Sequence, residues 1–310
     1  MTTTQQEVRG GRPETIRAIP VRHPGRWVGA ALIGVLAAML INSFLTNDVW
    51  NWSEQWKYIF SEPVLNGVKN TLWLTVVAMA GGIALGVLLA VMRLSRNPVL
   101  SGAAWFYIWF FRGTPLYTQL LLWGSIGALY ETVGIGLPFG PMFVTADMNQ
   151  LYSAAAAAAL GLLFNEAAYM SEIVRAGIIS VDEGQSEAAA SLGMTSNQTM
   201  RRVVLPQAMR VIVPPTGNEV MSMLKNTSLV AAIPYLDLTF SAQSIYARTY
   251  QIIPMLIMAC LWYLLMSSVL MIGQFYLERH FAKGTVRNLP LTPVQRVRGL
   301  FSASHGRDHQ

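Results

Sequence analysis

VDEGQSEAAASLGMTSNQTMRRVVLPQAMRVIVPP, residues 181–215, is the longest polar interruption between hydrophobic segments in the second half of this 310-residue chain. Residues 187–192 favour a helix by propensity, and Gly193 can end that helix as the residue just past its C-cap. Thr195 or Ser196 can cap a second helix. The stretch is therefore expected to fold as two short helices joined by a turn.

The second helix carries its own start and stop signals. Gln198 follows Thr195 by three residues, the spacing of a capping box. Pro206 predicts a helix boundary, because proline disfavours the helical conformation of the residue before it. A compact polar helix-turn-helix between two membrane spans fits a groove on a soluble partner, and the alternative interpretation is an ordinary cytoplasmic loop.

The spacing within this stretch resembles the signature loop of ABC-importer permeases. That pattern is Glu-Ala-Ala, three residues, Gly, nine residues, then an aliphatic residue, any residue and Leu-Pro. In this chain the pattern falls on Glu187, Ala188, Ala189, Gly193, Val203, Leu205 and Pro206, with Val203 where the pattern has Ile. In that family the loop couples the permease to its ATPase subunit, so the resemblance implies that these residues dock on an ATPase.

Composition predicts an integral membrane protein. Hydrophobic residues make up 53% of the chain and charged residues only 12%, whereas a soluble chain has about 25% charged residues. Several apolar runs reach the roughly 18 residues that cross a bilayer. The expected fold is all-α with six transmembrane helices, which fall at residues 27–46, 67–92, 114–129, 150–171, 211–232 and 252–275.

The predicted organisation has four parts. Residues 1–26 form a disordered basic tail, residues 27–46 an extra first span, and residues 281–310 a second basic tail. The permease core covers residues 64–280, and its coupling loop covers residues 172–210. Eighteen of the 22 Lys and Arg residues fall in the predicted cytoplasmic segments, so the positive-inside rule places both termini in the cytoplasm. The net charge of +6 is attributed to membrane orientation, and no nucleic acid is expected as a partner.

The core also resembles the polar amino-acid branch of type I ABC permeases, whose members carry His, Glu, Gln, Arg or opines. The resemblance rests on the stretches NGVKNTLWLT (66–75), FFRGTPLYTQL (110–120), AAYMSEIVRAGI (167–178), GQSEAAASLGM (184–194), LPQAMRVIVPP (205–215) and LKNTSLVAAI (224–233). That branch usually has five spans and an external N-terminus, so the first span of this chain is additional.

Polar groups inside apolar spans are the candidates for a translocation path, because such groups usually face a cavity or each other. They are Glu166, Asn218, Glu219 and Lys225, and they are followed by Asn226 and Thr227. Lys225 could hold a substrate carboxylate while Glu166 or Glu219 holds an ammonium group. Alternatively, Lys225 pairs with one of these carboxylates as a packing contact, and Asn226 and Thr227 cap a broken helix.

Four residues are predicted at an interface or gate. Arg112 is placed near the cytoplasmic interface, with residues 105–111 along the membrane surface and the crossing helix starting at Thr114. Pro115 follows in the same FFRGTPL stretch. Glu172 and Arg175, three residues apart, can form a local helical pair, and in the resembling family this region connects the pore to the coupling loop.

The sequence contains no signature of catalysis. It lacks GxxxxGK[ST] and HExxH, and its four histidines lie in the predicted tails. The single cysteine, Cys260, is expected to be a buried apolar side chain. The chain is therefore predicted to be no enzyme, with no cofactor or metal of its own, and ATP and Mg are expected on a partner ATPase.

Three functions remain to be compared. An ABC-importer permease would work with an ATPase dimer, a second permease copy or paralogue, an external solute-binding protein and membrane lipid, and would carry a polar amino acid. An ion-gradient-driven secondary transporter would often show internal inverted repeats, and no convincing repeat is seen. A structural subunit without a transport path is disfavoured by the buried charges.

Overall fold

The computed structural model describes residues 24–137 and 140–281, and the chain forms two compact units. The first unit ends at Trp50, and its described part consists of α1 (Pro24–Thr46) and the short helix η1 (Asp48–Trp50). Helix α1 is apolar on all sides and long enough to cross a membrane. Both predicted basic tails lie mostly outside the described residues.

The second unit is mostly helical, as the sequence predicts. Its elements are α2 (Trp52–Tyr58), α3 (Glu62–Arg93), α4 (Pro98–Gly113), α5 (Leu116–Gly124), α6 (Ile126–Leu129), β1 (Thr132–Gly136), β2 (Met142–Asp147), α7 (Met148–Leu151), α8 (Ala154–Ile179), α9 (Glu183–Ser191), α10 (Ser196–Thr199), η2 (Met200–Val204), α11 (Leu205–Asn226), η3 (Thr227–Ala232), α12 (Leu238–Thr249) and α13 (Ile252–Phe281).

Three described helices are long and apolar enough to span a bilayer on those criteria alone, namely α1, α3 and α13. The other three predicted spans do not meet both criteria, although α8 is continuous over 26 residues. The segment 114–129 is divided between α5 and α6, and the segment 211–232 ends as a 3₁₀ turn, η3. Cys260 lies on α13 and is exposed. Its expected burial is wrong, because it lies on a face of α13 that no described helix of the second unit covers.

Helices α3 and α8 pack closely because glycines remove side chains from their interface. A Cβ atom at Gly82 would lie 2.6 Å from Cγ of Glu166, and one at Gly86 would lie 2.6 Å from Cβ of Met170. Both distances are too short for real atoms, so the two backbones can approach only with glycine at these positions. Gly82 and Gly86 are therefore required for the close packing of α3 against α8.

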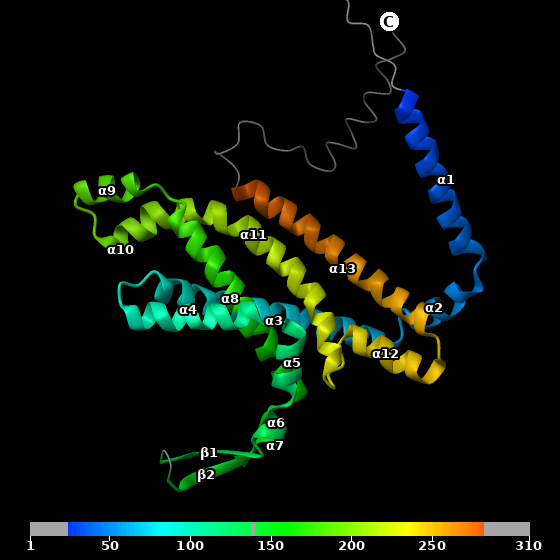
Figure 1. Ribbon diagram of the computed structural model, residues 1–310, viewed down its shortest axis with the longest axis horizontal. Helices are drawn as coiled ribbons and strands as arrows, with labels where there is room; N and C mark the ends of the chain where they lie inside the picture. The colour runs from blue at the N-terminus through cyan, green and yellow to red at the C-terminus, as the bar shows by residue number, and fades with distance from the viewer. Residues whose placement is uncertain (1–23, 138–139, 282–310) are drawn as a thin grey trace, which may run out of the picture. The chain divides into compact units, whose positions relative to one another are not determined.

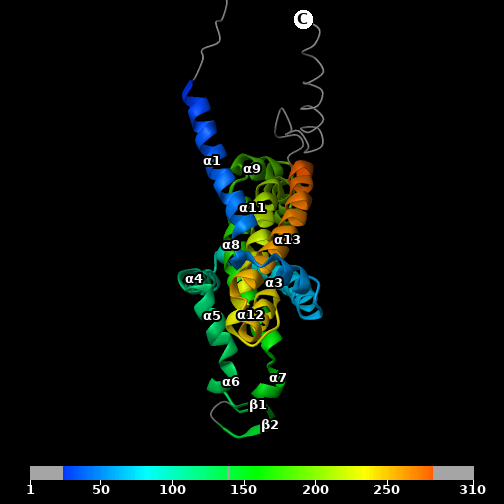
Figure 2. The same cartoon turned by 90° about the vertical axis from the view of Figure 1, so that its right-hand side faces the viewer.

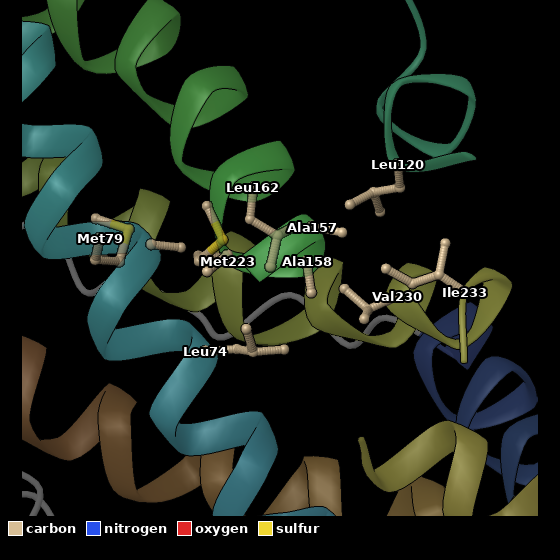
Figure 3. Close-up of a cluster of buried hydrophobic side chains, with 11 residues drawn as sticks. Leu74, Met79, Leu120, Ala157, Ala158, Leu162, Met223, Val230 and Ile233 are labelled. Atoms are coloured by element: carbon tan, nitrogen blue, oxygen red, sulfur yellow. The ribbon is translucent and has the colours of Figure 1, made fainter. Parts of the chain in front are cut away.

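A buried apolar cluster joins five elements around this interface (Figure 3). It is built from residues of α3, α5, α8, α11 and η3, among them Leu74, Met79, Leu120, Ala157, Ala158, Leu162, Met223, Val230 and Ile233. Small alanines on α8 face larger side chains from its neighbours, which allows close packing. The cluster holds α5 and α11 in fixed positions against α8.

Helix α4 runs back along α3 (Figure 1), and the expected path of residues 105–111 along the membrane surface stays a prediction. Near the start of α4, Nη1 of Arg93 donates to Oγ of Ser101 at 3.0 Å. Nearer its end, the hydroxyl of Tyr107 donates to the carbonyl of Phe164, 2.8 Å away on α8. Arg112 therefore lies beside the middle of α8, and its position near the cytoplasmic interface stays a prediction. A charged residue is tolerated there because it faces a polar cavity.

The helix expected to stop near Pro206 continues instead from Ser196 to Asn226. A π-helical turn, η2, joins α10 to α11, and the amide of Leu205 donates to the carbonyl of Met200, five residues back. Proline has no N–H to donate and clashes with the carbonyl four residues back in a regular α-helix. The wider π turn just before Pro206 relieves this conflict, so the helix is not broken.

The coupling-loop helices and a β-hairpin lie at opposite ends of the second unit (Figures 1 and 2). Helices α9 and α10 occupy one end. The hairpin of β1 and β2 occupies the other, with antiparallel pairs from Thr132↔Asp147 to Gly136↔Met142. The Gly- and Pro-rich connection between α6 and α7 therefore contains a short two-stranded antiparallel sheet.

Candidate functional site

A cavity of about 650 Å³ lies where the α4–α5 corner meets α8 and α11. The corner is formed by Thr114 and Pro115, which separate the two helices: Thr114 is the C-cap of α4 and Pro115 is the N-cap of α5. The residues lining the cavity are Arg112, Gly113, Thr114, Pro115, Leu116, Asn165, Glu166, Tyr169, Glu219, Ser222, Asn226 and Leu229. Most of these side chains are polar, which is unusual beside apolar helices and marks the cavity as the candidate site.

Three charged side chains face this cavity. Glu166 is 3% exposed, and its Oε1 has no hydrogen-bond partner within residues 24–137 and 140–281. Glu219 is half-buried on α11, and the guanidinium of Arg112 lies 5.3 Å from the centre of the Tyr169 ring. A buried carboxylate is costly without a partner, so this arrangement favours a cationic ligand.

A buried amide network fixes the backbone around Arg112. Nε2 of Gln119 donates to the carbonyls of Phe111 (2.9 Å) and Thr114 (3.1 Å) and to Oγ1 of Thr114. Nδ2 of Asn165 donates to the carbonyl of Phe111 and to Oε1 of Gln119, both at 3.1 Å. The helix break leaves these carbonyls without backbone partners, and the two side chains satisfy them.

The cavity brings together some of the predicted residues. Arg112, Pro115, Glu166, Glu219 and Asn226 all line it. Three other predicted path residues do not.

Asn218 accepts a hydrogen bond from Nε2 of Gln274 on α13, at 3.0 Å. Thr227 is buried and donates to the carbonyl of Leu224 at 2.6 Å, so it caps the end of α11. Lys225 is exposed. Neither ion pair found in the described part of the chain involves Lys225, so the alternative of a pair with Glu166 or Glu219 is not seen.

Four neutral polar residues in and around the cavity were not predicted from the sequence. Asn165, Tyr169, Ser222 and Gln119 carry no charge, and polar neutral residues occur in many membrane helices without a functional role. Only the position of Asn165 next to Glu166 could have pointed to it. The predicted local pair is confirmed, since Nη2 of Arg175 lies 2.7 Å from Oε2 of Glu172.

The turn of the coupling loop has the geometry that its sequence predicts. Gly193 adopts φ +77°, its amide donates to the carbonyl of Ala190 (2.9 Å), and the amide of Met194 donates to that of Ala189 (3.1 Å). These two bonds define a Schellman motif. The predicted capping box also forms, because Oγ1 of Thr195 accepts from the Gln198 amide and Oε1 of Gln198 accepts from the Thr195 amide.

The loop presents one exposed apolar side chain at its tip. Leu192 is 83% exposed and directly precedes Gly193, whereas Ala189, three residues earlier on α9, is buried. Glu187 and Ala188 are exposed. An exposed leucine on a rigid turn is suited to insertion into a groove on another protein. Leu192 was not among the predicted docking residues.

Comparisons with known proteins agree with this architecture. A family model described as binding-protein-dependent transport system inner membrane component matches residues 82–283. The arginine transport system permease protein ArgU of Corynebacterium glutamicum is 50% identical over 280 residues, which is 90% of this chain and 87% of that protein. The probable amino-acid ABC transporter permease protein YckA of Bacillus subtilis is 34% identical over 238 residues, covering 74% of this chain and 97% of YckA.

A solved structure has the same fold. The crystal structure of an amino acid ABC transporter with histidines superposes with a TM-score of 0.59 and 35% sequence identity, and covers 70% of this chain and 94% of that one. The chain therefore belongs to the family of binding-protein-dependent transport system inner membrane components. It is a multi-pass permease subunit of an ABC importer and not an enzyme, and ATP-driven import is favoured over ion-gradient-driven secondary transport.

Proposed function

We propose that this chain forms the translocation path for a cationic amino acid of the arginine type. The observation that carries the proposal is the charge balance of the central cavity, which holds two carboxylates, Glu166 and Glu219, and one guanidinium, Arg112. Two acids and one base leave a formal charge of −1. ArgU, the relative that is 50% identical to this chain, is named as an arginine permease.

Arginine complements this cavity group by group. Its ammonium and guanidinium groups supply two cations for the two carboxylates, and its carboxylate supplies one anion for Arg112. A zwitterion with a neutral side chain, such as glutamine, would leave one buried carboxylate without a partner. That desolvated, unpaired charge disfavours neutral amino acids.

Arg112 takes the role that the sequence suggested for Lys225. Arg112 lines the cavity with Glu166, whereas Lys225 lies on the exposed surface of α11. A planar guanidinium also matches a carboxylate with two parallel hydrogen bonds. A role for Lys225 in transport would require a second permease chain opposite it. Ser222 and Asn226 provide neutral polar groups at the cavity wall.

The coupling loop is proposed to dock on the ATPase. In the segment 172–210, the contact surface would be the tip formed by Glu187, Ala188, Leu192 and Gly193, while Leu205 and Pro206 begin the helix that connects the loop to the cavity. ATP and Mg would be bound by the partner ATPase dimer.

We place the loop and both termini in the cytoplasm because most Lys and Arg residues lie on that side. Six crossings, by α1, α3, α4–α5, α8, α11 and α13, agree with this orientation. The opposite end would face a solute-binding protein, and a second permease copy or a paralogue would complete the pore.

The test is uptake of labelled arginine into vesicles that contain the complete transporter. Wild type is expected to take up arginine only with ATP, and excess lysine should compete while citrulline, the neutral isostere of arginine, should not. The Glu166→Gln variant is expected to lower arginine uptake about ten- to a hundredfold, the factor for one lost hydrogen bond to a charged group. The preference of the Glu166→Gln variant for arginine over citrulline should also be weaker than that of wild type.

Lys225→Ala is the matched control, since it removes a charge outside the cavity. That variant is expected to retain uptake if no second chain engages Lys225. Equal competition by citrulline and arginine in wild type would contradict the charge argument. Uptake that persists without ATP and stops with an uncoupler would instead support a gradient-driven carrier.

A further inference from the structure

Two cavities meet at the end of α4. Beside the central cavity lies a second one of about 500 Å³, and Arg112, Gly113 and Tyr169 line both. The second cavity also reaches Arg93, the last residue of α3, and Glu172, on the stretch of α8 that leads into the coupling loop. It therefore extends from the central cavity toward the end of the molecule that carries the coupling loop. We call it the exit groove.

Arg112 and Tyr169, which line both cavities, are in contact with each other. The guanidinium lies 5.3 Å from the centre of the ring, within the range of a cation–π contact. The two ion pairs found in the described ranges are Lys57–Glu54 and Arg175–Glu172, so no carboxylate within 4.0 Å holds Arg112. A cation that contacts an aromatic ring and no carboxylate is free to move to a stronger anionic partner.

The backbone at this point is held by hydrogen bonds, whereas the Arg112 side chain takes part in neither ion pair of the described ranges. Gln119 is 3% exposed and Asn165 is 7% exposed, and they bond the carbonyls of Phe111 and Thr114 on either side of Arg112. Helix α4 is also tied to α8 by the Tyr107 hydroxyl. A movement that opens the wall is therefore confined to the side chains of Arg112 and Tyr169.

We propose that Arg112 and Tyr169 form a gate between the central cavity and the exit groove, and that substrate reaches the cytoplasm through this groove. Gln119 and Asn165 act as positioning residues that hold the backbone on either side of Arg112 in place. The side chain of Arg112 leaves the Tyr169 ring when a carboxylate enters the central cavity, and this movement opens the wall. The assignment rests on the proposed function, because it takes the central cavity as part of the translocation path.

Cysteine accessibility tests the gate in the complete transporter. Ser222 lines the central cavity but not the exit groove, and Cys260 is the only cysteine of the chain. Ser222→Cys in a Cys260→Ala background is labelled with a membrane-impermeant thiosulfonate from the coupling-loop side of inside-out vesicles without nucleotide. Adding Tyr169→Ala or Arg112→Gln is expected to raise the labelling rate about fivefold or more, as the loss of a cation–π contact would allow.

Tyr169→Phe is the matched control, because it keeps the ring and should leave the rate unchanged. The Cys260→Ala chain without Ser222→Cys gives the background. Asn165→Ala is expected to raise the rate as well, since it loosens the backbone beside Arg112. The gate would be overturned if the Tyr169→Ala and Arg112→Gln chains were labelled at the same rate as the parent chain. It would also be overturned if Tyr169→Phe raised the labelling rate as much as Tyr169→Ala does.

Labelling requires neither uptake nor a bound amino acid. A wrong substrate class would change the uptake competition and leave the labelling pattern intact. Conversely, normal arginine uptake by wild type, together with no effect of Tyr169→Ala on the labelling rate, would contradict the gate and leave the proposed function intact. If Tyr169→Ala fails to assemble, Arg112→Gln provides the same comparison from the other side of the contact.

Discussion

At the scale of single residues, the absence of a side chain at Gly82 leaves the space that the Glu166 side chain fills between α3 and α8. The nearest atoms to a Cβ at Gly82 would be Cγ and Cβ of Glu166, at 2.6 and 2.8 Å. Gly82→Ala is therefore expected to destabilise the protein by about 1–3 kcal/mol, the cost of overpacking a tight core. The measurement is the midpoint of thermal unfolding of the purified transporter in detergent.

Gly102 provides the control for this prediction, because it is also a helical glycine and a Cβ atom there would have no neighbour within 4 Å. Gly102→Ala should be neutral or raise the midpoint, since alanine favours helix over glycine by up to about 1 kcal/mol. Equal midpoints for the two variants would show that α3 and α8 do not pack as tightly as described. Arginine uptake should fall in Gly82→Ala only.

Which residues form the site was only partly predictable. Glu166, Glu219 and Arg112 stand out in sequence because a charge in an apolar helix is costly and needs a purpose. Lys225 satisfied the same rule but is exposed in the single chain. Helical periodicity tells which residues share a face and does not tell what lies opposite that face. The amide of Gln119 gave no signal, because its role depends on the carbonyls of Phe111 and Thr114, eight and five residues earlier in the chain, which a helix break frees.

At the scale of elements, the turn after α9 allows backbone and charge effects to be separated. Gly193 has φ +77°, and no atom lies within 4 Å of the position of a Cβ, so a side chain there meets only a backbone penalty within this chain. Asn and Asp both visit this conformation more readily than other residues, and they have the same shape. Gly193→Asn is expected to keep most of the ATPase in co-purification, while Gly193→Asp places a charge at the docking tip and should lose it.

Both variants should still insert in the membrane, since neither touches a span. Gly193→Val, which cannot adopt this conformation without strain, should lose the turn and the ATPase together. Normal ATPase retention and transport in Gly193→Asp would refute docking at this turn. If all three variants lose the ATPase, the inference is that the partner contacts Gly193 directly and leaves no room for a side chain.

Local elements were predicted well and packing-dependent ones were not. The Schellman turn at Gly193 and the capping box at Thr195 follow from short-range hydrogen bonds, and the sequence around them is sufficient to predict both. The return of α4 along α3 depends instead on contacts such as Tyr107 with Phe164, 57 residues apart in sequence. The π turn before Pro206 likewise could not be read from a rule that treats proline as a stop signal.

At the scale of the whole molecule, the two compact units imply that transport resides in the second. The first unit ends at Trp50, and the family match covers residues 82–283. Removal of residues 1–50 leaves every described contact of the central cavity, the coupling loop and the apolar cluster within the remaining chain. The truncated chain is expected to retain the ATPase and to take up arginine within about threefold of wild type, since no core interaction is lost.

Orientation is the risk in this truncation, because the new N-terminus would have to cross to the outside. The basic residues that remain on the coupling-loop side, including Arg93, Arg201 and Arg202, should suffice to orient the core. A chain with residues 27–46 replaced by an unrelated apolar span separates the two possible roles of α1. If truncation abolishes insertion and the replacement restores it, α1 is an orienting anchor. If the replacement inserts but loses uptake, α1 makes specific contacts that transport requires, and the core does not work alone.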